Sequence, residues 1–183
     1  MEKRTSDIAL FEYYGTPGAR KLCHLAKKGD AGAINMMARH MAASLPDDIY
    51  VIPVPNASGT AEYTLRLAKE ISRANPTIRV MDVMRGKSRM PQYVAKKKGI
   101  DIDFGFRKKI ARTKVPDNAY LIANVVATGR TMMKLREAIG KNLPVLAFAV
   151  DRTACRYGRE LRKNCFPGGP LPDSIVKRRV RLR

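Results

Sequence analysis

A short apolar segment that ends at a Thr-Gly turn constrains this chain more than any other feature. Residues Tyr120 to Val126 form an apolar run that only Asn124 interrupts, and the run stops at Ala127-Thr128-Gly129. Apolar residues then recur at helical spacing, at Met132, Leu135 and Ile139. The pattern predicts a buried strand, a tight loop and a helix.

The predicted loop carries groups that can hold a phosphate. Thr128 and Thr131 offer hydroxyls, Gly129 allows a close approach of the backbone, and the start of the helix offers amide groups. Arg130 adds a fixed positive charge. We therefore predict a phosphate site at residues 127–131. The alternative is that this loop only connects a strand to a helix.

Three more apolar runs indicate strands, at residues 49–55, 78–83 and 145–150. The last is continuous, as in a central parallel strand that is buried on both faces. Helical patterns separate these runs, so the chain is predicted to form an α/β parallel sheet with right-handed crossovers. Ligands of such sheets bind beyond the carboxyl ends of the strands.

The helical patterns lie before and between the strands. Residues 1–19 are expected to form a short strand or an irregular cover, and a helix is expected from Ala19, with a break at Gly29 and a second helix after it. The methionines of that second helix, Met36, Met37 and Met41, are interpreted as core residues. A third helix follows residues 56–60, with Thr60 as its cap and with a buried face at Leu65, Ala68 and Ile71.

The segment from Ala119 to Thr131 resembles the phosphoribosyl-pyrophosphate (PRPP) loop of type I phosphoribosyltransferases. In that family a hydrophobic strand, two acidic residues and two small or aliphatic residues precede Thr-Thr-Gly-x-Thr. Thr128, Gly129 and Thr131 match the positions that hold the ribose 5-phosphate. The resemblance implies a three-layer fold with a parallel sheet and a mobile hood.

Three positions depart from this pattern. Ala123 and Asn124 stand where the family has the acidic pair that grips the ribose hydroxyls, and Ala127 replaces the first threonine. The resemblance therefore implies that the phosphate half of the site is kept and the sugar half is altered. Asn124 is the residue expected to face the ribose, because its amide can still donate and accept hydrogen bonds.

The resemblance also assigns roles outside this loop. It places the pyrophosphate loop at Ser58, Gly59 and Thr60, and it implies PRPP or a nucleotide as ligand, with Mg²⁺ on the pyrophosphate. The hood corresponds to the basic segment 85–114. Its spacing of Arg85, Pro91-Gln92 and Lys96-Lys97-Lys98 loosely resembles the branch linked to DNA uptake (ComF type). The expected hood residues are Arg85, Lys87, Arg89 and Gln92.

The formal net charge of +20 is concentrated in two segments. Residues 85–114 carry a net charge of +9 and residues 152–183 carry +8, which leaves the remainder close to balanced. Such segments are typical of proteins that bind DNA or RNA; the alternative is a solvated basic surface. The predicted nucleic-acid contacts are Lys96, Lys97, Lys98, Lys177, Arg178, Arg179, Arg181 and Arg183.

The remaining features bound the class of protein. We expect one α/β domain over residues 1–151 with a basic appendage at 152–183. Three cysteines at no zinc-like spacing predict reduced thiols and no metal site, and no membrane helix or signal sequence is expected, so the protein is expected to be cytoplasmic. A homodimer is left open.

Two functions remain open at this point. The first is a phosphoribosyltransferase, which transfers the phosphoribosyl group and releases pyrophosphate. The second is a protein of the same fold with altered chemistry that binds nucleic acid through its basic segments. A nucleic acid that is itself the substrate would combine the two.

Overall fold

A five-stranded parallel sheet lies at the centre of the computed structural model, which describes residues 7–151 except for the side chains of Tyr93 and Lys96. Every neighbouring pair of strands in this sheet is parallel. The strand order is β1 (Ile8–Glu12), β7 (Val145–Val150), β6 (Ala119–Val126), β2 (Tyr50–Pro53) and β3 (Arg79–Val80). The predicted α/β parallel sheet is confirmed.

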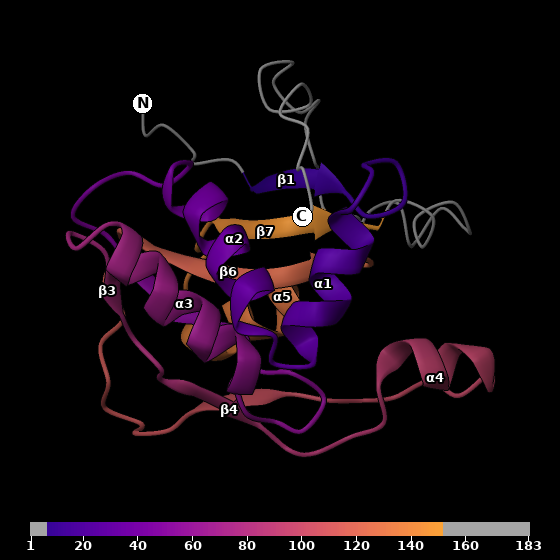
Figure 1. Ribbon diagram of the computed structural model, residues 1–183. Coiled ribbons are helices and arrows are strands. Elements are labelled where there is room, and N and C mark those ends of the chain that lie inside the picture. The colour runs from indigo at the N-terminus through magenta and orange to yellow at the C-terminus, as the bar shows by residue number, and fades with distance from the viewer. Residues whose placement is uncertain (1–6, 152–183) are drawn as a thin grey trace.

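Helices cover both faces of the sheet and complete three layers (Figure 1). One face packs against α1 (Ala19–Lys27), α2 (Ala31–Ala42) and α3 (Glu62–Ala74), which share one apolar cluster with the sheet. The opposite face packs against α5 (Arg130–Ile139) through a second cluster. Phe148 and Leu146 of β7 belong to the first cluster and Val145 and Ala147 to the second, so this strand is buried on both faces as predicted.

The two N-terminal helices separate at Gly29, as expected. Gly29 has a positive φ of 87°, which ends α1, and Asp30 then caps α2 by accepting a hydrogen bond from the Ala33 amide at 2.8 Å. Met37 and Met41 are fully buried in the core. The interpretation as core residues is confirmed for these two, whereas Met36 is only partly buried and packs against the same cluster.

Two expected features of the third helix and strand differ. Thr60 does not cap α3: its hydroxyl donates to the Glu62 carboxylate, and Ala61 stands at the N-cap position without a side-chain bond. Leu65 is only partly buried, because the buried stripe of this helix is Thr64, Leu67, Ala68 and Ile71. The third strand, β3, spans only two residues. Its pairing with β2 ends at the hydrogen bond from the Met81 amide to the Val51 carbonyl.

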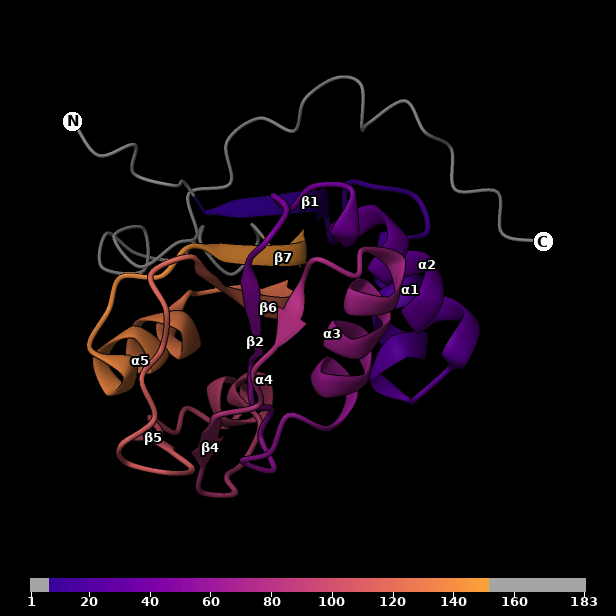
Figure 2. The same ribbon diagram turned by 90° about the vertical axis from the view of Figure 1, so that its left-hand side faces the viewer.

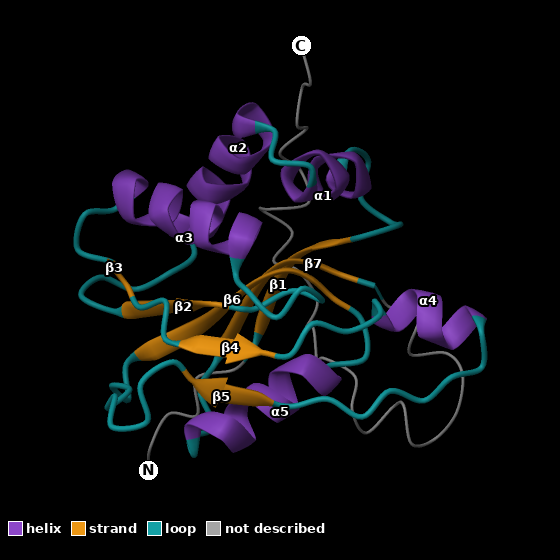
Figure 3. Cartoon of the chain, turned by 90° about the horizontal axis from the view of Figure 1, so that it is seen from below, coloured by secondary structure: helices purple, strands orange, loops and turns teal. Residues whose placement is uncertain are grey.

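The basic segment after β3 has secondary structure of its own. Met84–Gly86 (β4) and Phe106–Lys108 (β5) form an antiparallel ribbon, and α4 (Gln92–Lys97) lies between them in sequence. Met84 and Phe106 pack into the second apolar cluster, which anchors the ribbon. Figure 2 shows β5 next to α5, and Figure 3 shows α4 to one side of the sheet. The role of this segment as a hood stays a prediction.

Two further expectations concern the ends of the chain and membranes. The predicted short strand near the N-terminus is β1, which pairs with β7 at the edge of the sheet. The expected basic appendage at 152–183 lies outside the described residues. No helix in the described part of the chain has the length and hydropathy needed to cross a bilayer.

Candidate functional site

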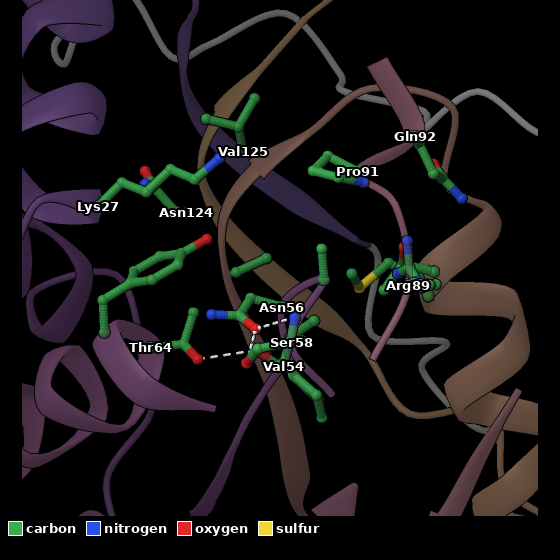
Figure 4. Close-up of a pocket in the computed structure, with 16 residues that line it drawn as sticks. Lys27, Val54, Asn56, Ser58, Thr64, Arg89, Pro91, Gln92, Asn124 and Val125 are labelled. Carbon is green, nitrogen blue, oxygen red and sulfur yellow. Dashed lines mark hydrogen bonds between the residues drawn. The ribbon is translucent and has the colours of Figure 1, made fainter. Parts of the chain in front are cut away.

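A cavity of about 320 Å³ opens at the carboxyl edge of the sheet, beside β2 and β6. These two strands are parallel neighbours, so the loops that follow them emerge side by side. Ser58 from the first loop and Thr131 from the start of α5 both line the cavity. The close-up in Figure 4 shows Asn56 and Ser58 beneath the cavity, Asn124 on one side and Gln92 on the other.

The 127–131 loop turns sharply into α5. Gly129 has a φ of 76° at the N-cap position, a conformation that favours glycine, and its carbonyl accepts from the Met133 amide. The Arg130 amide lies 3.4 Å from the Thr128 hydroxyl. Ala127, Thr128, Gly129 and Arg130 are partly exposed and stand outside the cavity lining, so the loop meets the cavity through Thr131.

Arg130 is held by the basic segment. Its guanidinium donates to Asp101 Oδ1 at 2.8 Å and to the Ile102 carbonyl at 3.4 Å. The hydrogen bond from Arg130, together with its charge, lowers the pKa of the Asp101 carboxyl. A phosphate that used Arg130 would therefore compete with Asp101.

Side-chain hydrogen bonds hold the 56–60 loop together. The Ser58 hydroxyl lies 2.5 Å from Asn56 Oδ1, 2.8 Å from the Thr60 hydroxyl and 3.1 Å from Glu62 Oε1. Gly59, at a φ of 89°, accepts from the Gly86 amide at 2.9 Å. The Ala57 carbonyl accepts from the Arg89 amide at 2.8 Å. The loop is thus joined to the beginning of the basic segment.

Asn124 lies at the inner wall of the cavity and is only 4% exposed. Its Nδ2 donates to the Cys23 carbonyl at 3.0 Å, while its Oδ1 has no hydrogen-bond partner among the described residues. The nearby Tyr63 is half-buried, and desolvation is the main cause that raises its pKa to about 12, against a smaller lowering by Asn124. Asn124 Oδ1 is therefore a buried acceptor without a described partner at the wall of the cavity.

The expected hood residues divide into two groups. Arg89 and Gln92 line the cavity, and Gln92 Nε2 is buried without a described partner. Arg85 and Lys87 are exposed and do not line it. The Arg89 guanidinium lies 4.0 Å from the centre of the Phe104 ring, and burial, followed by the charge of Arg130, lowers its pKa.

Several predicted residues lie away from the cavity. Gly59 and Thr60 belong to the 56–60 loop but not to the lining. Lys97 and Lys98 are exposed at the end of α4. The side chain of Lys96 and the tail residues Lys177, Arg178, Arg179, Arg181 and Arg183 lie outside the described part of the chain.

Sequence reasoning missed four polar residues of the lining: Lys27, Asn56, Tyr63 and Thr64. Lys27 is the last residue of α1, and Tyr63 and Thr64 lie in the first turn of α3. Only the packing of α1 and α3 against one face of the sheet brings these residues to the end of β6. The small-residue loop 56–60 was the one sequence signal near Asn56.

Comparison with known proteins gives resemblance at the level of structure alone. No family model and no curated protein matches the sequence. A hypoxanthine-guanine phosphoribosyltransferase from Bacillus anthracis, solved with HEPES in its active site, is 14% identical with a TM-score of 0.37, over 64% of this chain and 66% of that one. A hypoxanthine phosphoribosyltransferase from Trypanosoma cruzi is 15% identical with a TM-score of 0.41, over 82% of this chain and 70% of that one.

Proposed function

We propose that this chain binds PRPP or a nucleotide phosphate at the 127–131 loop and transfers a phosphoribosyl group with release of pyrophosphate. One observation carries the proposal: the loops that follow two adjacent parallel strands, β2 and β6, contribute side chains to a single cavity. The first loop offers Ser58 and the second offers Thr131 at the start of a helix. A helix start with a neighbouring hydroxyl suits a phosphate.

The residues take distinct roles in this proposal. Thr128, Thr131 and the first amides of α5 receive the 5-phosphate, and Ser58 meets the pyrophosphate with the backbone of Gly59 and Thr60. Asn124 Oδ1, which lacks a partner among the described residues, accepts a hydrogen bond from a ribose hydroxyl. A nucleophile then displaces pyrophosphate at C1 through an oxocarbenium-like transition state. The basic segment excludes water during this step.

The expected Mg²⁺ does not fit the described lining of the cavity. Mg²⁺ prefers carboxylate, phosphate and water oxygens. None of the described lining residues is Asp or Glu, and no group of three or more His, Cys, Asp or Glu side chains gathers anywhere in residues 7–151. The proposed reaction therefore contains no step through this metal.

Ribose 5-phosphate tests the phosphate site. We expect it to raise the melting temperature of the wild-type protein, and we expect ribose without phosphate not to do so. Thr131→Val keeps the side-chain shape and removes the hydroxyl, so it should weaken binding roughly tenfold. Gly129→Val should abolish the shift, because a branched side chain opposes the positive φ at this position. No shift with ribose 5-phosphate would contradict the proposed site.

Release of pyrophosphate from PRPP tests the transfer itself. The assay supplies bases and amines as acceptors and follows pyrophosphate over time. Turnover that is lost in Thr131→Val, with the protein still folded by circular dichroism, would support the proposal. Binding of ribose 5-phosphate without turnover on any acceptor would leave a binding protein in place of a transferase.

A second function, binding of nucleic acid, is favoured by the β4–β5 ribbon. Arg85 lies directly opposite Arg107 in this antiparallel pair, and both are exposed. Like charges in this position are destabilising, so a bound polyanion would relieve a cost that the free ribbon bears. Lys87 and Lys109 are exposed nearby, and Lys109 pairs with Asp82.

Salt dependence tests this second function. We expect the anisotropy of a labelled oligonucleotide to report binding that weakens steeply with salt. Arg85→Gln with Arg107→Gln should flatten the slope of log K against log salt by about 0.9 for each phosphate that the ribbon no longer neutralises. The exposed residues Arg39 and Lys69 on α2 and α3 supply the matched control, Arg39→Gln with Lys69→Gln. An equal change in both double variants would contradict a specific role for the ribbon. Neutralising Lys177 to Arg183 tests the tail separately.

A further inference from the structure

The cavity has a lining of one charge sign. Its two charged side chains are Lys27, at the end of α1, and Arg89, in the basic segment. None of the other described lining residues carries a carboxylate. Figure 4 shows Lys27 and Arg89 on opposite sides of the cavity. Such a lining selects an anion.

Arg89 is fixed in place and is not neutralised by a described carboxylate. Its backbone amide donates to the Ala57 carbonyl, and its guanidinium stacks on Phe104. The ion pairs of the described residues do not include Arg89, whereas the neighbouring Arg130 is paired with Asp101. Burial and the charge of Arg130 both lower the pKa of Arg89, which is the direction expected for a cation that lacks a counter-ion.

Two buried polar atoms of the lining residues lack a described partner. Asn124 is 4% exposed and lines the cavity, and its Oδ1 has no described hydrogen-bond partner. Gln92 Nε2 is buried at the cavity as well, and it has no described partner either. A buried polar atom without a partner carries a desolvation cost. A ligand with phosphate oxygens and a sugar hydroxyl would satisfy both atoms.

One carboxylate next to the 56–60 loop, that of Glu62, is already engaged. Glu62 begins α3 and accepts hydrogen bonds from the Ser58 and Thr60 hydroxyls, and it is not part of the lining. A divalent cation on the ligand would therefore be brought beside Lys27 and Arg89, and none of the described lining residues would offer it a carboxylate. Like charges at this range repel each other.

We propose that this cavity binds the diphosphate group of a sugar diphosphate without a divalent metal, with Arg89 and Lys27 supplying the positive charge. Arg89 contacts the diphosphate oxygens through its fork of donors, Gln92 Nε2 donates to them, and Asn124 Oδ1 accepts from the sugar hydroxyl. The inference deepens the proposed function by naming the metal requirement of the ligand. It also stands without phosphoribosyl transfer, because it concerns binding alone.

Calorimetry with inorganic pyrophosphate, and then with PRPP, tests the inference on the full chain. Titrations are run in EDTA and again in excess Mg²⁺. We expect binding in EDTA, at equal or tighter affinity than in Mg²⁺. Arg89→Met should weaken binding in EDTA at least tenfold and Lys27→Met severalfold, whereas Arg89→Lys should give an intermediate loss. Arg39→Met and Lys69→Met, at exposed sites on α2 and α3, should leave the affinity unchanged.

The outcomes separate this inference from the proposed function. Binding of pyrophosphate that requires Mg²⁺, or no binding at all, overturns the inference. Equal losses in the Arg89 and Arg39 variants would show attraction to overall charge and would overturn it too. If pyrophosphate binds in EDTA while ribose 5-phosphate fails to bind, the inference holds and the proposed phosphoribosyl function fails.

Discussion

The two loops at the carboxyl edge of the sheet are built in different ways. In the 56–60 loop, the side chains of Asn56, Ser58 and Thr60 bond to one another or to Glu62, and the backbone is joined to residues 86–89. In the 127–131 loop, the Arg130 amide lies at the longer distance of 3.4 Å from the Thr128 hydroxyl. The guanidinium of this arginine is instead held from outside by Asp101.

The difference indicates that the two loops have different roles. The 56–60 loop is a preformed support whose shape is fixed by its own hydrogen bonds. The 127–131 loop depends on the basic segment for the position of Arg130, and a ligand that takes Arg130 must release Asp101. The first loop should therefore respond to substitution mainly in stability, and the second mainly in ligand response.

Gly59→Ala should produce the largest loss of stability. Gly59 has a φ of 89°, and a Cβ placed there would lie 2.4 Å from the Gly86 carbonyl oxygen, a backbone atom that cannot move aside cheaply. We expect the free energy of unfolding to fall by about 2–4 kcal/mol. Urea denaturation at constant slope measures it.

Gly99→Ala is the matched control for this substitution. Gly99 also has a positive φ, of 65°, but no atom lies within 4 Å of a Cβ built on it. Only the conformational strain remains, which is about 1 kcal/mol. Equal losses in the two variants would mean that the close approach of Gly59 to the Gly86 carbonyl adds no steric cost.

Glu62→Ala should have a smaller effect on the same loop. It removes the acceptor for the Ser58 and Thr60 hydroxyls and the one acidic residue in the first turn of α3. A loss of about 1 kcal/mol is expected from these contacts. Glu137→Ala, which breaks an exposed pair with Lys134, should cost less than about 0.5 kcal/mol. If Glu62→Ala matches Glu137→Ala, the network within the loop is not a support.

Much of the sheet could be predicted from the sequence, for a physical reason. Val145 to Val150 is a short continuous apolar run, which is typical of a strand that is buried on both faces. The loop after β6 could be predicted equally well, because Gly129 and the helical spacing after it mark a sharp turn into α5. These signals are local in the chain.

The rest of the site depends on contacts between distant segments. Lys27 ends a helix whose sequence pattern shows only an amphipathic stripe, and its place at the cavity follows from packing against the sheet. The hydrogen bond from the Gly86 amide to the Gly59 carbonyl joins a loop to β4. The basic composition of residues 85–114 gave no signal for that strand. The hydrogen-bond partner of Asn124 is also distant, since its amide bonds to Cys23. No spacing in the sequence indicates such pairs.

The smallest effect expected is a change in the titration of Asp101. The pKa of this carboxyl is lowered in the folded chain by the hydrogen bond from Arg130. The ion pair is therefore complete at neutral pH and breaks as the pH falls through the lowered pKa. NMR titration of the Asp101 carboxyl should show a pKa below the ordinary value of roughly 3.9. In Arg130→Met the pKa should return to that value, whereas Lys134→Met should leave it low. Addition of ribose 5-phosphate to the wild-type protein should raise the pKa of Asp101, because the phosphate takes Arg130 from it. An unchanged pKa of Asp101 in saturating ribose 5-phosphate would mean that Arg130 stays with the basic segment while the ligand binds. The proposed difference in role between the two loops would then be wrong.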